Sequence, residues 1–258
     1  MHRAIVIALL LLVGGCADSL GLPSPEASKT IADAKSVGVI SAVGHKFAVQ
    51  KIGITVFGNE LNEVPIDVWG IDDAVANKVG ALLGGRFAVK KINYPKGIFT
   101  PYETPTAFTE PDAVLQGIVR NVAGSQKFDL YIVVTRAGVP FGSSNQAVSG
   151  LGIVEVGGLI NVDNVHLYAI TTVHVYDGRT FERLHWRRTD FQIGASLLGK
   201  VINGPHRTLD RSWWPHNAQV AQNEKLKSAT RALVEQSLAT TIPDVIGAKT
   251  AAREKKGL

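Results

Sequence analysis

The pattern of hydrophobic and polar positions separates this chain into strands and helices. Runs of β-branched and aromatic residues predict strands, and a central strand is expected at Phe128–Thr135, where nearly every residue is of this kind. Apolar residues that recur every three or four positions predict amphipathic helices. The predicted strands cover 36–43, 46–57, 86–93, 128–135, 153–160 and two hairpin arms, 165–176 and 179–188; the predicted helices begin near 72, 109 and 223, and 192–203 is compatible with a short helix.

Boundary residues indicate where the predicted helices begin and end. Asp72 or Asp73 is expected to cap the first helix, which Gly84-Gly85 ends. A helix start accounts for this carboxylate pair without a catalytic role. Thr109-Glu-Pro-Asp112 resembles a capping box at the start of the second helix. The final helix, 223–240, is expected to end before Pro243, because proline disfavours a helical conformation at the residue before it.

A turn signal predicts a long β-hairpin in the C-terminal half. Asp177-Gly178 supplies the two positive-φ residues that a tight turn needs. With a two-residue loop, His174 faces Phe181 and Thr172 faces Arg183. The register of the hairpin therefore depends on the length of this turn.

The order of elements predicts a single α/β domain. Strand, helix, strand, helix, strand, hairpin and helix follow one another, which is typical of a mixed sheet with helices packed on it in two or three layers. The long C-terminal β-hairpin belongs to this sheet, and an α+β arrangement stays open. The proline-rich stretch 94–108 and the Gly/Ser-rich stretch 138–152 are expected to be loops.

The first sixteen residues have the pattern of an export signal followed by a lipid-attachment site. Basic residues precede an unbroken apolar run, Ala4–Val13. Ten residues rise only about 15 Å as a helix, half of the roughly 30 Å hydrocarbon core, so this run is too short to span a membrane and fits a signal peptide. Val13-Gly14-Gly15-Cys16 then resembles the lipobox of bacterial lipoprotein precursors.

The lipobox resemblance implies a membrane anchor and a location. It implies cleavage before Cys16, a diacylglyceryl thioether on its sulfur and a further acyl chain, such as palmitate, on the new amine, which together hold a protein stably at a membrane. Ala17, with Asp18 one position later, favours the periplasmic face of the outer membrane over the inner membrane. An ordinary secretory signal is the alternative. The expected divisions are a signal peptide over 1–15, a lipidated cysteine and tether over 16–28, the periplasmic α/β domain over 29–248 and a basic flexible tail over 249–258.

Composition limits the partners that this chain is expected to have. The 258 residues include one cysteine, so an exported form makes no internal disulfide and relies on packing. The formal net charge of +5 can attract anionic lipid or wall polymer, although a mild positive balance also keeps a protein soluble. Export makes nucleic acid the least expected partner. The expected partners are the membrane through the anchor, an envelope protein or wall polymer, and a second copy in a homo-oligomer.

The catalytic and cofactor motifs in the sequence are incomplete. Gly194–Lys200 has the spacing of a phosphate-binding loop, but Val201 stands where Ser or Thr must hold magnesium. A dinucleotide pattern that starts at Gly150 has Glu155 in place of its third glycine. No cofactor is therefore predicted. A serine nucleophile with a distant His and Asp stays open, because such triads are recognised by geometry.

The segment 206–216 holds the candidate binding residues. His206, Asp210 and His216 could form a facial metal set. The adjacent Trp213 and Trp214 could stack on a sugar ring or insert at a lipid headgroup. The alternative is a loop held down by its tryptophans, and the lack of a paired His-x-x-x-His spacing favours it. Neither a metal site nor a catalytic residue is therefore predicted here.

The element order behind the anchor also carries a resemblance. The residues that carry it are Ser36–Val43, the helix to Gly85, Phe87–Ile92, Asp129–Val134 and the Asp177-Gly178 hairpin. In this order the chain resembles the periplasmic α/β domains of the curli-secretion lipoprotein, the lipoprotein activators of peptidoglycan synthases, and the amino-terminal domain of the Tol translocation protein. The resemblance implies a non-catalytic binding or assembly accessory. A periplasmic hydrolase of wall or lipid substrates and a subunit of an oligomeric secretion channel are the alternatives.

Overall fold

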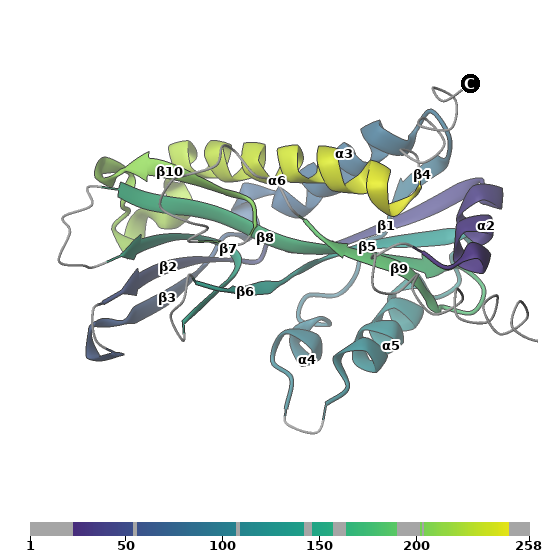
Figure 1. Cartoon of the computed structure of the whole chain (residues 1–258), viewed down its shortest axis with the longest axis horizontal. Helices are drawn as coiled ribbons and strands as arrows, with labels where there is room; N and C mark the ends of the chain where they lie inside the picture. Colours follow the sequence, from purple (N-terminus) through teal and green to yellow (C-terminus); the bar gives the residue numbers. More distant parts are fainter. Residues whose placement is uncertain are drawn as a thin grey trace, which may run out of the picture.

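The computed structural model describes residues 23–53, 56–106, 109–141, 146–156, 164–189, 202 and 204–247. These residues form a single α/β domain in which helices pack on a mixed sheet (Figure 1). The predicted signal peptide, Cys16, the basic tail and nearly all of the stretch 192–203 lie outside the described residues.

The described elements are ten strands, five α-helices and four short 3-10 helices. The strands are β1(Ser36–Ala42), β2(Lys46–Ile52), β3(Glu60–Pro65), β4(Ala88–Lys91), β5(Leu130–Arg136), β6(Gly138–Pro140), β7(Ala147–Val156), β8(Asn164–Asp177), β9(Arg183–Arg188) and β10(His206–Asp210). The α-helices are α2(Pro25–Asp33), α3(Ile71–Leu83), α4(Thr100–Glu103), α5(Pro111–Ala123) and α6(Glu224–Val245), and the 3-10 helices are η2(Val56–Gly58), η3(Asp67–Trp69), η4(Arg211–Trp213) and η5(Asn217–Gln222).

Strand β8 is 14 residues long and pairs on both of its edges. Its second half pairs with β5 and β9, and its first half pairs with β7 and β10. The neighbours change at Ile170–Thr171, where the N–H of Ala137, just after β5, donates to the Ile170 carbonyl. The N–H of Gly150 in β7 in turn donates to the Ala137 carbonyl. Strands β5 and β7 therefore follow each other along one edge of β8.

Strands β1 and β2 follow each other in the same way, because β1 pairs in parallel with β5 and β2 pairs in parallel with β7. The sheet thus consists of two half-sheets joined end to end through β8. One has the order β4-β1-β5-β8-β9 and the other β3-β2-β7-β8-β10. We call the level at which they meet the sheet junction; it comprises residues 43–45, 136–137, 149–150 and 170–171.

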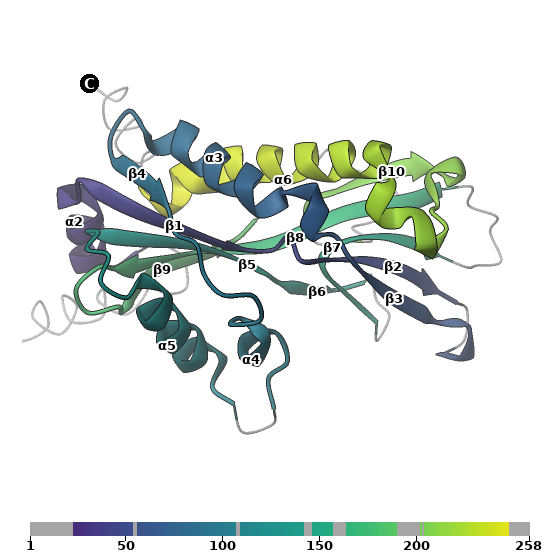
Figure 2. The same ribbon diagram turned by 180° about the vertical axis from the view of Figure 1, so that it is seen from behind.

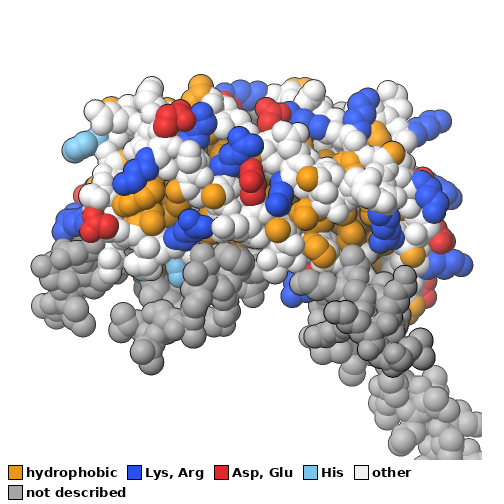
Figure 3. All heavy atoms as spheres, turned by 90° about the horizontal axis from the view of Figure 1, so that it is seen from above, with side chains coloured by type: hydrophobic (Ala, Val, Ile, Leu, Met, Phe, Trp, Pro, Cys, Tyr) orange, Lys and Arg blue, Asp and Glu red, His pale blue; other side chains and the backbone are white. Residues whose placement is uncertain are grey.

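Helices cover both faces of the sheet. Helices α3 and α6 lie side by side over one face (Figures 1 and 2), where their apolar side chains bury the largest core cluster against alternate residues of β1, β5 and β8. Helices α4 and α5 lie on the opposite face, against the half-sheet that contains β1 and β5. On the outer surface of α3 and α6, Lys and Arg side chains are spread among uncharged and apolar ones (Figure 3), so the positive charge is not gathered into one patch on this described face.

Several predicted elements are confirmed, while one loop prediction and the end of one predicted strand are wrong. The strands at 36–43 and 128–135 and the helices near 72, 109 and 223 are present. The expected loop over 138–152 instead contains β6 and the first part of β7, because Val148 and Leu151 are fully buried. The strand expected over 46–57 ends at Ile52. Its partner β3 was not predicted, because half of its side chains are polar and most of them are exposed.

The predicted two-residue turn of the C-terminal hairpin is also wrong. The turn spans residues 178–182, and the positive φ of 60° falls at Phe181. The Asp177 carboxylate accepts from the N–H groups of Arg179 and Thr180, which stabilises the longer loop. His174 therefore lies opposite Trp186, and Thr172 lies opposite Arg188.

Three predicted boundaries differ from the structure. Helix α2 begins at Pro25, so the last residues of the expected tether 16–28 are helical, and the Ser24 side chain caps this helix. The cap of α5 is Glu110, which makes no side-chain capping bond, so the expected capping box is absent there. Helix α6 continues past Pro243 to Val245, because the buried side chains around the proline offset one lost backbone hydrogen bond.

The turn glycine Gly178 offers a test of the hairpin geometry. Its N–H donates to the Asp129 carbonyl, and a Cβ at this position would lie 1.8 Å from the Phe128 carbonyl oxygen. We expect Gly178→Ala to lower the free energy of unfolding by about 2–3 kcal/mol, measured by urea denaturation. Gly85→Ala is the matched control, because a Cβ at Gly85 meets nothing within 4 Å. Equal stabilities of the two variants would contradict the described turn.

Candidate functional site

Two adjoining hollows open where the sheet junction meets the ends of the parallel strands. Strands β1, β4 and β5 run parallel, and their carboxyl ends point to this level, a common position for ligand sites in α/β proteins. The first hollow has a volume of about 380 Å³ and the second about 490 Å³. Glu103 of α4 lines both, and we call the pair the junction groove.

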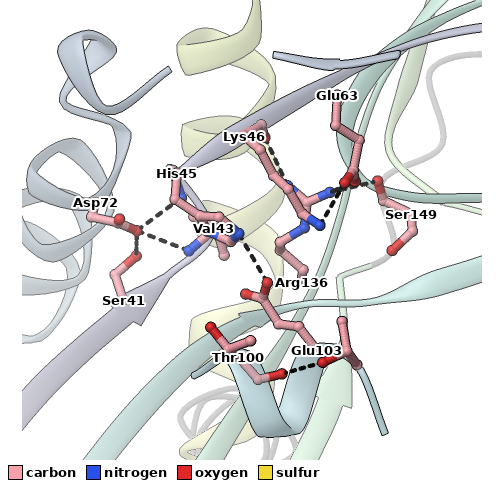
Figure 4. A network of polar contacts seen from close by, with 12 residues as sticks. Ser41, Val43, His45, Lys46, Glu63, Asp72, Thr100, Glu103, Arg136 and Ser149 are labelled. Carbon is pink, nitrogen blue, oxygen red and sulfur yellow. Dashed lines mark hydrogen bonds and ion pairs between the residues drawn. The ribbon is translucent and has the colours of Figure 1, made fainter. Parts of the chain in front are cut away.

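A buried carboxylate lies at the inner side of the first hollow. Asp72 accepts hydrogen bonds from the Ser41 hydroxyl at 2.6 Å and from the N–H groups of Val43 and Gly44 at 2.9 and 3.2 Å (Figure 4). Burial raises the pKa of Asp72 above its ordinary value, although these bonds and the nearby His45 act in the opposite direction. Through its three hydrogen bonds, Asp72 connects α3 to the end of β1 and to the turn between β1 and β2.

Asp72 and Asp73 lie in the first turn of α3, as predicted, but the prediction that one of them caps this helix is wrong. The residue before α3 is Gly70, which has a φ of 61° and makes no side-chain capping bond. The neighbouring Asp73 does point outward and forms an ion pair with Lys91 of β4. One carboxylate of the pair is thus part of the groove and the other belongs to the surface.

Tyr94 extends the polar network of the first hollow. Its hydroxyl donates to the Ser41 carbonyl. Burial raises the pKa of the Tyr94 hydroxyl, and the negative charges of Asp72 and Glu103 raise it further. The hydroxyl is therefore protonated at every physiological pH and acts as a hydrogen-bond donor.

A contact between a histidine and a carboxylate links the sheet junction to helix α4. His45, in the turn between β1 and β2, has its Nε2 atom 2.9 Å from a carboxylate oxygen of Glu103 (Figure 4). The Glu103 side chain is only 13% exposed, so this contact is shielded from bulk water. Glu103 lines both hollows, and His45 lines the first.

A buried arginine supports the second hollow. One terminal nitrogen of Arg136 donates to the Lys46 carbonyl at 2.7 Å, and the other donates to the Ser149 carbonyl at 3.4 Å. The second nitrogen also lies 3.6 Å from Glu63, which is paired with the Lys46 ammonium at 2.8 Å (Figure 4). Burial lowers the pKa of Arg136, while Glu103 and Glu63 counteract this effect. Arg136 thus bridges strands of both half-sheets.

Gly150 makes room for this arginine. Its φ is +64°, and a Cβ built on it would lie 2.4 Å from the central guanidinium carbon of Arg136. A side chain at position 150 is therefore excluded by both backbone conformation and space. The dinucleotide pattern that begins at Gly150 has a structural explanation in this contact.

The groove arrangement favours recognition over nucleophilic catalysis. A serine nucleophile needs a base that accepts its proton, usually a histidine. Ser41 instead donates to the Asp72 carboxyl, and His45, which lines the same hollow, contacts Glu103. These groups hold one another in place, and the groove still presents donors and acceptors to a ligand.

The metal candidates predicted in 206–216 are not brought together. The Nδ1 atom of His206 is hydrogen-bonded to the Gly204 carbonyl at 2.9 Å. Asp210 is exposed and caps η4 through the N–H of Ser212. The two lie four residues apart in β10, roughly 13 Å by strand rise. His216 is exposed and lines a separate small hollow with Trp214. No cluster of three His, Cys, Asp or Glu suitable for a metal occurs in the part of the chain that the structure describes.

The two predicted tryptophans lie away from the junction groove. Trp213 and Trp214 are partly buried and pack against the core beneath α3 and α6. The ammonium of Lys225 lies 3.8 Å from the Trp213 ring centroid. Neither tryptophan lines the junction groove.

Sequence reasoning missed the groove residues His45, Glu63, Glu103 and Arg136. One signal could have identified Arg136: it directly follows six residues, Leu130–Thr135, that form a fully apolar or β-branched strand. A charge at the end of such a central strand needs buried partners. The partners themselves come from β3, α4 and the β1–β2 turn, and periodicity does not indicate them.

No protein-family model and no curated protein matches this chain. Similar solved structures are protein XCC0632 from Xanthomonas campestris (family model DUF330; 9% identity, covering 85% of this chain and 88% of that one, TM-score 0.35), lipoprotein GNA1162 from Neisseria meningitidis (12%, 78% and 96%, 0.27) and the LpoB C-terminal domain from Salmonella enterica (14%, 65% and 93%, 0.22). At these TM-scores the similarities carry no argument about function. Among the described residues, no helix has the length and hydropathy needed to cross a bilayer.

Replacing Arg136 tests whether it holds the two half-sheets together. Arg136→Met leaves the Lys46 and Ser149 carbonyls without their donor, so we expect a loss of about 3–5 kcal/mol in the free energy of unfolding, measured in urea. Arg136→Lys should lose less, because it keeps the charge. The control is Arg188→Gln, an exposed change expected within about 0.5 kcal/mol of wild type. A wild-type midpoint for Arg136→Met would refute the bridging role.

Asp72 should make stability depend on pH. Because its pKa is raised in the folded state, the native protein binds more protons than the unfolded chain at pH values just above 3.8. The cost of its buried charge is therefore present near pH 7 and disappears as the pH falls. Asp72→Asn removes this titration but keeps an acceptor for the Val43 N–H. We expect wild type to gain stability relative to this variant between pH 7 and pH 4, measured by urea unfolding.

The exposed neighbour provides the control for this pH series. Asp73→Asn removes a surface carboxylate from the same helix turn. The difference in unfolding free energy between wild type and Asp72→Asn should therefore vary strongly with pH, and the difference between wild type and Asp73→Asn should vary less. If wild type loses stability relative to Asp72→Asn as the pH falls, the charge of Asp72 is stabilised in the fold and our account of it is wrong.

Proposed function

We propose that this chain is a lipid-anchored protein of the bacterial envelope that binds another envelope component without catalysing a reaction. The support for the anchor is the sequence Val13–Cys16 directly after the apolar run Ala4–Val13. Acylation of Cys16 would hold the domain at the membrane surface. The residues after Cys16 favour the periplasmic face of the outer membrane.

One observation carries the binding role: the carboxylates at the centre of the junction groove are each held by neighbouring groups. Asp72 is held by Ser41, His45 by Glu103, and Glu63 by Lys46 and Arg136. Catalytic groups are usually poised with an open side toward the reacting atoms, whereas a fixed set of donors and acceptors suits recognition. The partner would be an envelope protein or a wall polymer, and a homo-oligomer is compatible with this role.

The experiment is co-purification of the full chain from solubilised membranes, with each bound component quantified. We expect a stoichiometric partner, and we expect Glu103→Gln to recover at least about tenfold less of it, because the change breaks the pair with His45 that both hollows share. Glu110→Gln is the matched control, since Glu110 is exposed and makes no capping bond. Cys16→Ser should move the protein from the membrane fraction to the soluble fraction.

Two results would overturn this proposal. A purified monomer without a partner that hydrolyses wall or lipid substrates, with activity lost in a groove variant, would show an enzyme. Retention of Cys16→Ser in the membrane fraction at the wild-type level would show that acylation of this cysteine does not anchor the protein.

A further inference from the structure

We propose that the second hollow of the junction groove binds a sugar chain that carries a carboxylate, with Trp186 stacking on a sugar ring and Arg188 pairing with the carboxylate. This inference rests on the proposed function and names the chemical class of the bound component. It is carried by three observations on the hollow: an exposed aromatic ring at its rim, an uncompensated positive charge beside that ring, and a mixed polar lining.

The aromatic ring comes from β9. Side chains alternate between the two faces of a strand, and on β9 His185 is buried while Arg187 reaches Asp244 of α6 at 3.6 Å. Trp186 and Arg188 therefore lie on the other face and line the second hollow. Trp186 is 53% exposed, which is unusual for so large an apolar side chain. The guanidinium carbon of Arg183 lies 5.8 Å from the centroid of the Trp186 ring, so the indole face on the other side is the one that can stack against the C–H face of a sugar ring.

The second hollow is lined by more basic than acidic side chains. Among its described lining residues, Lys46, Arg136 and Glu63 form one cluster, and Glu103 is paired with His45. Arg188 is exposed and makes no ion pair with the described residues, so its guanidinium can form a bidentate pair with a ligand carboxylate. A ligand with a negative charge near Trp186 would therefore bind better than its neutral analogue.

The remaining lining suits hydroxyl groups. Carboxylates at Glu63 and Glu103 accept hydrogen bonds, while Lys46 and the hydroxyl groups of Tyr102 and Thr172 can donate them. A lipid chain would require an apolar lining, and a polybasic or polyacidic partner would require one sign of charge. The volume of about 490 Å³ lies within the range of roughly 300–1,000 Å³ that is usual for ligand sites.

The test is calorimetric titration of the full chain in detergent with two probes of equal length. One is a peptide-free tetrasaccharide of alternating N-acetylglucosamine and N-acetylmuramic acid, which carries carboxylates, and the other is neutral chitotetraose. We expect the acidic probe to bind more tightly. Trp186→Ala should weaken it on the order of tenfold, with a smaller loss for Trp186→Phe. Arg188→Gln should abolish the preference for the acidic probe.

Matched controls lie in the same chain. Arg187→Gln changes the adjacent arginine on the opposite face of β9, and Trp213→Phe changes a tryptophan outside the groove; both should bind as wild type does. Wild-type affinity in Trp186→Ala and Arg188→Gln would overturn the assignment, and so would equal binding of the two probes. If neither probe binds at millimolar concentration but a protein partner co-purifies, this inference fails and the proposed function stands. If no partner is found either, both fail.

Discussion

Strand β8 forms hydrogen bonds along both edges over its whole length, and the positions of the other strands depend on that pairing. A single strand would normally have one neighbour on each side. Here each edge is shared by two strands in succession, β5 then β7 on one side and β9 and β10 on the other. The result is a sheet of two half-sheets, which meet where β8 changes its neighbouring strands at Ile170–Thr171.

The junction groove lies where the strands that pair with β8 change. Where β5 ends and β7 begins, backbone carbonyls such as those of Lys46 and Ser149 accept hydrogen bonds from Arg136. Buried carbonyl groups need a donor, but a buried guanidinium also needs compensating charge. Glu63 supplies that charge and in turn pairs with Lys46. A polar, partly open cluster at the centre of the sheet is therefore a consequence of interrupting the strands.

The same reasoning connects the two hollows. Asp72 accepts a hydrogen bond from Val43 in the turn between β1 and β2. His45, in the same turn, contacts Glu103 of α4. Helix α4 thereby closes one side of both hollows. The groove is built from the β1–β2 turn, β3, β5, β9 and α4, so its contents depend on how distant segments meet. A ligand at Trp186 would contact groups that also hold the half-sheets together, which links recognition to the stability of the junction.

Local sequence determined the anchor pattern, the class of the fold and most of its elements. The lipobox-like Val13–Cys16, the buried strand around Ile132 and the amphipathic helices are properties of neighbouring residues, and periodicity is sufficient to predict them. The tertiary structure alone decided the rest. The exposed segment β3 is a strand because β2 lies beside it. The position of the hairpin turn is fixed by the contact of Gly178 with Asp129, and Arg136 is a bridge because Gly150 leaves space for it. The site depends on pairs 13 to 90 residues apart, such as Arg136 with Ser149 and Arg136 with Lys46, and a local pattern carries no information about which distant partner will meet a given charge.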